Sequence, residues 1–315
     1  MEKKLDLRIP SPIFELHHPI LDAFDIRVSV KRDDLIHEVI SGNKWRKLKL
    51  NIEKYYEKGY EKLLTYGGAY SNHIAATAQV GKELGVPTIG IIRGDELNPS
   101  SNQTLALAKE NGMQLIFVSR SEYAMRYEND YKNELRARFG RILIVEEGGA
   151  NFLGVMGCTE IVSELKESYD AIFLAAGTGT TTAGVLLATD NVPVYSVPVL
   201  KNGGFIHESV SDLLMYSGLT DEIIAEYLQQ LKLLTNYHFG GYGKYTDELI
   251  SFMNDVYAVS SLKLDQVYTA KALYALFSEV KNNRIAPGSK LLFIHTGGLQ
   301  GAQGISDRLD YTIED

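Results

Sequence analysis

Short apolar runs alternate along this chain with longer stretches in which apolar residues recur at helical spacing. The runs span residues 62–66, 88–92, 114–118, 142–145, 171–175, 194–197 and 291–295, and the helical stretches include 72–84, 101–111, 153–168 and 268–283. Runs rich in Ile, Leu and Val with little polar alternation are typical of parallel strands covered on both faces. Strand and helix in turn predict an α/β fold with two open, mostly parallel sheets flanked by helices.

Length and charge narrow the class of protein. The chain has 315 residues, enough for about two domains of roughly 150 residues each. Its formal net charge of −8 argues against a nucleic-acid partner, which would need a basic face. The single cysteine, Cys158, rules out a disulfide within the chain and argues against a cysteine-based metal cluster. We therefore expect no metal, and expect Cys158 to be a small buried hydrophobe on a helix.

The sequence also bears on whether the chain is targeted to or crosses a membrane. The first residues, MEKKLDLRIPSPIFEL, carry charges but no apolar run, so we expect no signal peptide. No apolar stretch approaches the ~18 residues that a membrane span requires. The expectation is a cytoplasmic protein with no membrane partner.

The first candidate site motif is SGNK at residues 41–44, a small flexible turn that opens a helix. A helix N-terminus carries partial positive charge, and this field, together with burial, lowers the pKa of a lysine toward its neutral, nucleophilic form. Lys44 is therefore a candidate for covalent attachment of a carbonyl group. The alternative is a solvated basic helix face, because further lysines follow along the same stretch.

The second motif is GGAYSNH at residues 67–73, which follows a strand-like run. Two glycines free the backbone, and Ser71 and Asn72 open the next helix. Helix capping requires only one such small polar residue. Capping therefore leaves the remaining polar side chains, Tyr70 and His73, available for a site.

The third motif is Gly177-Thr178-Gly179-Thr180-Thr181, between a buried strand and a helix. Glycines let the backbone approach a phosphate, whose charge is favoured by the amide groups of a helix start. The lysine of a Walker loop and the third glycine of the dinucleotide fingerprint are both missing. A phosphate monoester is the remaining candidate, and a reactive lysine with a phosphate cup is the equipment that pyridoxal phosphate needs.

With these motifs and three more, the chain resembles the fold-type II pyridoxal-phosphate family of D-cysteine desulfhydrase and 1-aminocyclopropane-1-carboxylate deaminase. The resemblance runs from about residue 10 to 304 and rests on SGNK-x-RKL (41–48), GG-x-x-SNH (67–73), GTGTT-x-AG (177–184), GYG (241–243), LD-x-VYT-x-K (264–271) and HTGG (295–298). It implies that Lys44 holds the cofactor as a Schiff base, that Asn72 donates to the cofactor's ring hydroxyl, and that Thr269 partners its pyridine nitrogen. The phosphate cup is residues 177–181.

The resemblance also implies the substrate side of the site. Ser71 matches a polar group beside the substrate carboxylate and Cα, and Tyr242 and Tyr268 match two active-site tyrosines. The remaining expected substrate contacts are Asn72, His73, Tyr70 and Thr296. Tyr70 departs from the glutamine that the family often carries there, which puts substrate specificity in question, and Trp45 is bulkier than the family's usual residue.

The family's architecture implies two domains in this chain. Residues 1–47 and 147–315 would form the large cofactor-binding domain, and residues 48–146 a small inserted α/β domain. Family members are usually homodimers, so we expect a homodimer that acts on a small amino acid.

Three positions bear on the branch of the family. The deaminase branch tends to carry Glu, Leu and Gln where this chain has Thr269, Thr296 and His73. A carboxylate beside the pyridine nitrogen keeps the ring protonated and strongly electron-withdrawing, which ring opening of a cyclopropane would need. A threonine hydroxyl can instead donate to an unprotonated nitrogen, and β-elimination of a thiolate tolerates the weaker ring.

The prediction is therefore a D-cysteine desulfhydrase that releases pyruvate, sulfide and ammonia. Lys44 would take the Cα proton as general base, with Tyr268 or Tyr242 as a possible acid. Deamination of 1-aminocyclopropane-1-carboxylate and β-elimination from another small D- or sulfonated amino acid stay open as alternatives. A third alternative is a non-catalytic phosphate-binding protein of the same fold.

Overall fold

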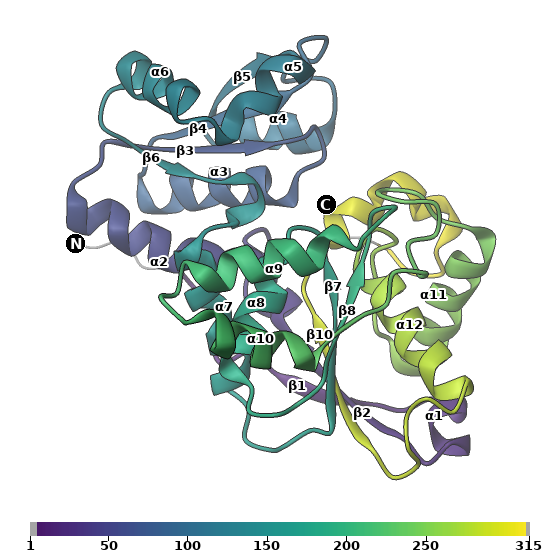
Figure 1. The fold of residues 1–315 in the computed structure, drawn as a ribbon. Coiled ribbons are helices and arrows are strands. Elements are labelled where there is room, and N and C mark those ends of the chain that lie inside the picture. Colours follow the sequence, from purple (N-terminus) through teal and green to yellow (C-terminus); the bar gives the residue numbers. More distant parts are fainter. Residues whose placement is uncertain (1–4, 313–315) are drawn as a thin grey trace. The chain divides into compact units, whose positions relative to one another are not determined.

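The computed structural model describes residues 5–312 (Figure 1). Within this range the strands form two separate sheets, and the chain divides into two compact units. The four-stranded unit comprises residues 5–7, His37–Ile40 and Lys44–Gly157, and the six-stranded unit comprises Arg8–Ile36, Ser41–Asn43 and residues 158–312.

The four-stranded unit is built on a parallel sheet with the order β5-β4-β3-β6. Its strands are β3 (Lys62–Gly67), β4 (Thr88–Arg93), β5 (Gln114–Val118) and β6 (Ile142–Val145). Leu63 pairs in register with Thr88 on one side and Leu143 on the other. All four strands were predicted from apolar runs, which such doubly covered strands require.

The helical segments of this unit include members on both faces of its sheet. They are α2 (Asn43–Lys58), α3 (Asn72–Leu84), α4 (Gln103–Glu110), α5 (Arg120–Ala124), α6 (Asn129–Phe139) and the first part of α7 (Phe152–Ser163), with 3-10 turns η2 (Met125–Tyr127) and η3 (Glu147–Gly149). Leu64 and Tyr66 of β3 pack with side chains of α5 and α6. Ile92 of β4 packs on the other face with Ile74 of α3. Figure 1 shows α3 and α6 on opposite sides of the sheet.

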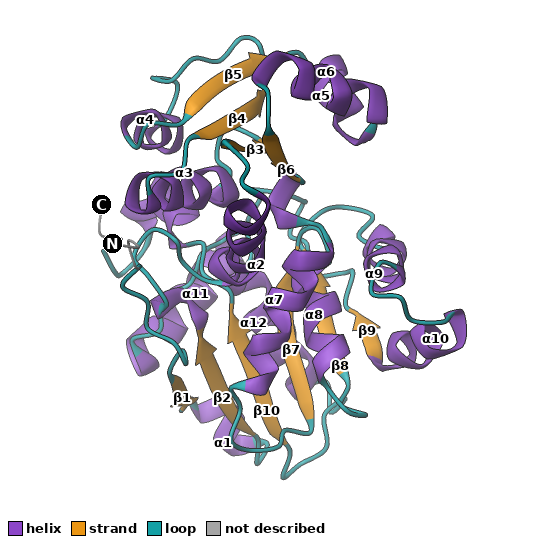
Figure 2. Ribbon diagram, turned by 90° about the vertical axis from the view of Figure 1, so that its left-hand side faces the viewer, coloured by secondary structure: helices purple, strands orange, loops and turns teal. Residues whose placement is uncertain are grey.

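The six-stranded unit has the strand order β1-β2-β10-β7-β8-β9, which Figure 2 shows side by side. Its strands are β1 (Ile13–Leu16), β2 (Arg27–Arg32), β7 (Ala171–Ala176), β8 (Val194–Pro198), β9 (Leu231–Leu233) and β10 (Lys290–His295). Within the described residues, β1 pairs antiparallel with β2 and the other neighbours pair in parallel. The two sheets and their helices confirm the predicted fold class.

Helices also flank this larger sheet. They are α1 (Pro19–Ala23), α8 (Thr180–Ala188), α9 (Phe205–Met215), α10 (Asp221–Gln230), α11 (Asp247–Ser260) and α12 (Thr269–Lys281), with 3-10 turns η1 (Asp33–Leu35) and η4 (Leu299–Arg308). Phe173 and Phe293 lie in one core with the buried sides of α11 and α12. Figure 1 shows α8 on the other side of this sheet. Cys158 is buried, as expected.

The parallel strands place their carboxyl ends at one edge of each sheet, where ligands bind in open α/β folds. β3 ends at the second sequence motif, β7 ends at the third, and β10 ends at HTGG. The strands missed by the sequence analysis, β1, β2 and β9, carry none of the motifs.

Candidate active site

The turn that precedes Lys44 is held by backbone contacts inside the six-stranded unit. Gly42 has φ +66°, and a Cβ there would lie 1.8 Å from the Thr296 carbonyl oxygen. The Gly42 N–H donates to the Asp33 carbonyl (2.9 Å), and the Asn43 N–H donates to the Thr296 carbonyl (3.2 Å). Only glycine fits such a close approach with a positive φ. Thr296 thus contributes its backbone to this turn, and its side chain is nearly buried.

Asn43 links the same turn to the third motif. Its side-chain amide donates to the Thr181 hydroxyl at 2.9 Å, and both residues are buried. Lys44 is the next residue in the chain and the second residue of α2. The residue before the candidate lysine is therefore fixed to the start of α8.

The helix that carries Lys44 is not a solvated basic face, so that alternative is wrong. Lys44 is half-buried, and its neighbours Arg46 and Lys47 are 0% and 4% exposed. Gly149 leaves room for Lys47, because a Cβ on Gly149 would lie 2.8 Å from the Lys47 Cβ. The basic side chains of this turn are thus partly or fully buried.

The second motif forms a tight turn between β3 and α3. A Cβ on Gly67 would lie 2.4 Å from the Ile74 Cγ1 atom and 2.8 Å from the Ser71 side chain. Ser71 is the N-cap of α3, and its hydroxyl accepts a hydrogen bond from the Ile74 N–H at 3.3 Å. Asn72 is the first residue of the helix and is half-buried, whereas Tyr70 is 68% exposed.

The hydrogen bonds around His73 define its tautomer. The Thr65 hydroxyl donates to the Val145 carbonyl at 2.8 Å, so it must accept its 3.0 Å bond from the His73 Nε2–H. The other ring nitrogen, Nδ1, has no hydrogen-bond partner among residues 5–312. Burial, followed by the charges of Lys44 and Lys47, lowers the pKa of His73 well below its usual value. His73 is therefore a neutral histidine whose Nδ1 carries a lone pair.

The third motif joins β7 to α8 and has the features of an anion cup. Gly179 is the N-cap of α8 with φ +78°, and no side chain caps the helix start. The Thr178 and Thr180 hydroxyls lie 2.9 Å apart. Gly177 lies beside the Tyr268 ring, which a Cβ would approach to 3.3 Å. An uncapped helix start with glycines and hydroxyls fits a phosphate monoester.

Tyr242 and Tyr268 contact each other edge to face, with ring centroids 6.0 Å apart. Tyr268 is the N-cap of α12, and Tyr242 lies in a glycine-rich loop and is 48% exposed. The fully buried Lys271 holds this loop, because its Nζ donates to the carbonyls of His238 (2.9 Å) and Gly241 (2.8 Å). The two predicted tyrosines are thus brought together in the six-stranded unit.

Lys271 belongs to the motif at residues 264–271, but the sequence analysis gave it no role. Burial lowers its pKa to about 8, although the Asp265 carboxylate opposes the shift. The signal available in the sequence was a lysine inside the otherwise apolar helical stretch of α12. A charged residue on such a face is seldom buried without polar partners.

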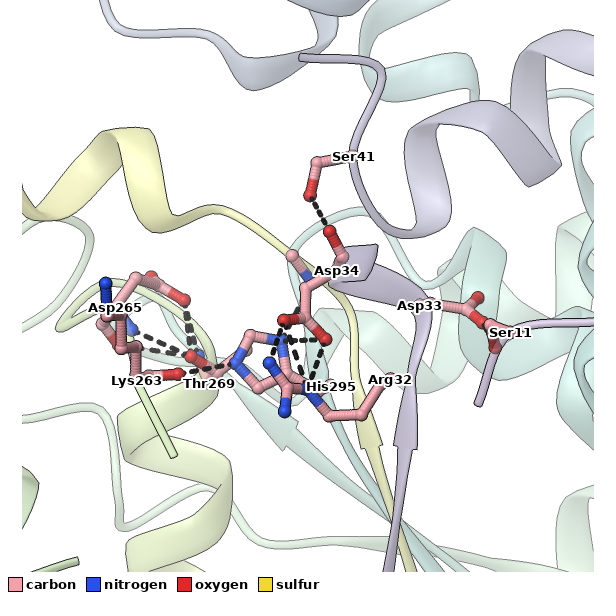
Figure 3. Close-up of polar contacts among 10 residues, drawn as sticks. Ser11, Arg32, Asp33, Asp34, Ser41, Lys263, Asp265, Thr269 and His295 are labelled. Atoms are coloured by element: carbon pink, nitrogen blue, oxygen red, sulfur yellow. Dashed lines mark hydrogen bonds and ion pairs between the residues drawn. The ribbon is translucent and has the colours of Figure 1, made fainter. Parts of the chain in front are cut away.

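Thr269, the first residue of α12, bonds to Asp265. Its hydroxyl lies 2.6 Å from the Asp265 Oδ2 atom, and the Asp265 N–H donates to the same hydroxyl at 2.9 Å. Nearby, His295 Nε2 donates to the Lys263 carbonyl at 2.8 Å, and its Nδ1 lies 3.3 Å from the Asp34 carboxylate. Figure 3 shows these contacts.

The predicted residues thus fall into two groups, each described within its own unit. The four-stranded unit holds Lys44, Tyr70, Ser71, Asn72 and His73. The six-stranded unit holds the phosphate-cup residues 177–181 with Tyr242, Tyr268, Thr269 and Thr296. The roles given to these residues stay predictions.

Two properties of the described residues concern membrane spanning and metal binding. No helix within residues 5–312 is long and apolar enough to cross a membrane. The same residues hold no group of three or more His, Cys, Asp or Glu side chains placed to bind a metal ion.

Comparison with known proteins identifies the family. The family model described as "Pyridoxal-phosphate dependent enzyme" matches residues 5–297. A Thermotoga maritima protein named "Putative 1-aminocyclopropane-1-carboxylate deaminase" is 32% identical, over 97% of this chain and 99% of that protein. An Arabidopsis thaliana protein named "Bifunctional D-cysteine desulfhydrase/1-aminocyclopropane-1-carboxylate deaminase, mitochondrial" is 28% identical, over 96% of this chain and 79% of that protein.

A solved structure agrees with these relatives. It is described as an ACC deaminase homologue and aligns with a TM-score of 0.80 and 29% identity, over 98% of this chain and 95% of that chain. The matches confirm pyridoxal phosphate as the cofactor and confirm the resemblance found in the sequence. The chain belongs to the pyridoxal-phosphate-dependent enzymes, within the family of 1-aminocyclopropane-1-carboxylate deaminase and D-cysteine desulfhydrase.

Proposed function

We propose that this protein is a lyase that converts D-cysteine to pyruvate, sulfide and ammonia. Lys44 carries the cofactor, Gly177–Thr181 bind its phosphate, Asn72 donates to its ring hydroxyl, and Thr269 lies at its pyridine nitrogen. The cup supports this assignment, because its uncapped helix start and glycines suit a phosphate. The bond between Asn43 and Thr181 supports the pairing of this cup with the lysine that follows Asn43.

The chain's own residues account for the proton transfers. When bound, the cofactor withdraws electrons from the substrate and acidifies its Cα–H bond. The substrate's amine would first take the place of Lys44 on the cofactor, which frees the lysine amine. Lys44 lies in the first turn of α2, where the helix field disfavours its charged form, so the freed neutral amine would take the Cα proton. The Cβ–S bond then breaks, and Tyr268 or Tyr242 protonates the sulfide. Hydrolysis of the released enamine gives pyruvate and ammonia.

The substrate side is assigned to the turn between β3 and α3. Ser71 and Asn72 lie at the helix start, where the N-terminal field favours a carboxylate. Tyr70 is exposed and can contact a ligand, and Thr296 lies behind the Lys44 turn. Of the two ring nitrogens of His73, Nε2 is engaged by Thr65, which leaves Nδ1 to face a ligand.

The identity of residue 269 is the observation that favours sulfur elimination over ring opening. A hydroxyl, rather than a carboxylate, stands at the start of α12. Thiolate is a good leaving group, so its elimination needs less electron withdrawal than the opening of a carbon ring.

Deamination of 1-aminocyclopropane-1-carboxylate is the second candidate. It is favoured by the Asp265 carboxylate, which lies 2.6 Å behind the Thr269 hydroxyl, and by the names of the relatives. A small D- or sulfonated amino acid other than D-cysteine is the remaining alternative, because Tyr70 departs from the family pattern.

A substrate panel tests the proposal. Purified protein is assayed with D-cysteine, D-serine and 1-aminocyclopropane-1-carboxylate for sulfide, pyruvate and 2-oxobutyrate. We expect sulfide and pyruvate from D-cysteine at the highest rate. Faster consumption of 1-aminocyclopropane-1-carboxylate would overturn the substrate assignment and leave the cofactor standing.

Covalent mapping tests the lysine. Borohydride reduction should fix the cofactor on Lys44, and Lys44→Ala should abolish both the adduct and turnover. Lys49→Ala, on the same helix, is the matched control and should keep both. An adduct on Lys47 would mean that the wrong lysine of the segment has been chosen.

The organisation of the chain is proposed on the same basis. Residues 48–146 would form the small inserted domain, and residues 1–47 and 147–315 the large domain. The assembly would be a cytoplasmic homodimer, to be checked by analytical ultracentrifugation.

A further inference from the structure

The Thr269 hydroxyl has its proton directed at a carboxylate. It accepts a hydrogen bond from the Asp265 N–H at 2.9 Å, and it lies 2.6 Å from Asp265 Oδ2. An ionised carboxylate can only accept hydrogen bonds, so the hydroxyl is the donor in the shorter contact. A hydroxyl has one proton and two lone pairs. One lone pair of Thr269 is left for a ligand.

Asp265 is held in one orientation by its other bonds. Its Oδ1 accepts from the N–H groups of Val267 (2.9 Å) and Tyr268 (2.7 Å), and its Oδ2 also accepts from the Thr269 N–H (3.0 Å). The side chain is fully buried. Burial raises the pKa of this carboxyl, and the hydrogen bonds from Thr269 and Tyr268 oppose that rise. Four donors on two oxygens fit an ionised carboxylate.

Two basic side chains, His295 and Lys271, act electrostatically on this carboxylate. His295 at the end of β10 lowers the pKa of Asp265, and the buried Lys271 of α12 interacts with it electrostatically. His295 Nδ1 in turn lies 3.3 Å from the Asp34 carboxylate, and Asp34 is paired with Arg32 at 2.6 Å. Figure 3 shows Arg32, Asp34, His295, Asp265 and Thr269 in one group. Asp265 therefore lies in a buried polar environment.

We propose that Asp265 is a positioning residue that acts through Thr269, so that Thr269 accepts a hydrogen bond from a protonated pyridine nitrogen. The inference rests on the proposed function, in which Thr269 lies at that nitrogen. Asp265 fixes the hydroxyl proton on its own side, and Thr269 presents a lone pair to the ring. Deaminases tend to carry a carboxylate at position 269. In this chain the Asp265 carboxylate would act on the ring through the Thr269 hydroxyl. The carboxylate acts on the ring only through a neutral hydroxyl, so the better leaving group, thiolate, still favours sulfur elimination over ring opening.

Nitrogen NMR of the holoenzyme tests the inference, with cofactor labelled by 15N in the ring. The wild-type ring nitrogen should have the chemical shift of a protonated pyridine at neutral pH. In Asp265→Asn the new amide donates to Thr269, which turns the hydroxyl proton toward the ring, and the shift should move to the unprotonated range. Thr269→Val should show the same change with the Asp265 bonds to the helix start in place, and Thr269→Ser should restore the wild-type shift.

A matched control separates positioning from simple helix capping. Thr246 caps α11 through its hydroxyl, whereas Asp265 accepts hydrogen bonds from the N–H groups of Tyr268 and Thr269 at the start of α12. Thr246→Val should lower stability without moving the 15N shift. An unprotonated wild-type ring, or one shift shared by wild type, Asp265→Asn and Thr269→Val, would overturn the inference.

The proposed function is checked separately in the same samples. Borohydride should fix the cofactor on Lys44 in each variant that binds it. Failure of the wild-type protein to form that adduct would remove the proposed function, and the inference with it. A normal adduct with an unchanged shift would remove the inference alone.

Discussion

At the scale of single residues, the turn before Lys44 depends on the absence of a side chain at Gly42. The position has φ +66°, and a Cβ would lie 1.8 Å from the Thr296 carbonyl oxygen, so the backbone must move to admit one. Gly42→Ala should therefore lower the free energy of unfolding by about 3 kcal/mol or more. It should also weaken cofactor binding, because Asn43 and Lys44 would shift with the turn. Urea unfolding and cofactor titration measure the two effects.

Gly218 provides the matched control for this substitution. It has φ +78°, and a Cβ there would meet nothing within 4 Å. Gly218→Ala should cost about 1–2 kcal/mol, the conformational penalty of a left-handed residue alone. Equal losses in the two variants would mean that the contact with Thr296 does not matter.

Because the amine of Lys271 is buried, we predict that the free energy of unfolding depends on pH. The pKa of Lys271 is lowered to about 8 from 10.5, so between these values the unfolded chain binds more protons and stability rises with pH. Lys271→Met should remove this rise. The substitution also leaves the carbonyls of His238 and Gly241 without their donor. Each unsatisfied carbonyl should lower the free energy of unfolding by about 1–3 kcal/mol at every pH. Unfolding free energies measured from pH 7 to 10 should show the gap between wild type and variant widening.

Lys232 is the control for the pH experiment. Its amine also donates to a carbonyl, that of Gln229, but the residue is exposed. Lys232→Met should leave both the stability and its pH dependence nearly unchanged. A gap for Lys271→Met that stays constant with pH would contradict the lowered pKa.

At the scale of elements, the start of α8 is where the cofactor phosphate is expected. Gly179→Val would place a β-branched side chain at φ +78° beside the helix start. Losing one charge-assisted hydrogen bond of about 1.5–3 kcal/mol should raise the cofactor's dissociation constant by about 10- to 100-fold. Gly204→Val at the start of α9, where a Cβ meets nothing within 4 Å, is the control. Similar dissociation constants for the two variants would argue against a phosphate at α8.

Strands that are uniformly buried and apolar were predictable, and β2, which carries a buried charge, was not. β2 was missed because Lys31 and Ser29 interrupt its apolar residues. Lys31 is tolerated there only because Glu164 and Ser11 bind its amine. α7 ends at Ser163, five residues before the predicted end, and the next residue, Glu164, binds Lys31 and the Ser11 N–H through its side chain. Neither partner can be inferred from local periodicity.

At the scale of the whole molecule, cofactor binding should appear as stability. A ligand that binds only the folded state stabilises it by about 2.7 kcal/mol at a free concentration of 100 times its dissociation constant. Pyridoxal phosphate should therefore raise the melting temperature of the wild-type protein. Lys44→Ala should lose most of this increase and Lys49→Ala should keep it. An equal increase in all three proteins would show that binding does not involve Lys44.

The sequence located the candidate site through its motifs but not the groups behind them. Glycines and small polar residues are visible in one sequence because turns and phosphate binding demand them locally. Asp265 was part of a motif, yet its bond to Thr269 becomes apparent only when the start of α12 is seen. Asp34 lies far along the chain from His295, so their contact could not be anticipated.

The order of strands in the six-stranded sheet has a consequence for synthesis on the ribosome. β2 leaves the ribosome before the strands of the four-stranded sheet, but its parallel neighbour β10 is made after all of them. The four-stranded sheet draws its strands from one continuous stretch, residues 62–145, so it can form while the rest is still being made. Chains are synthesised at about 5–20 residues per second, and domains generally fold as units. The nascent chain should thus bury the core of the four-stranded unit first, while β1 and β2 wait for β10 to be made.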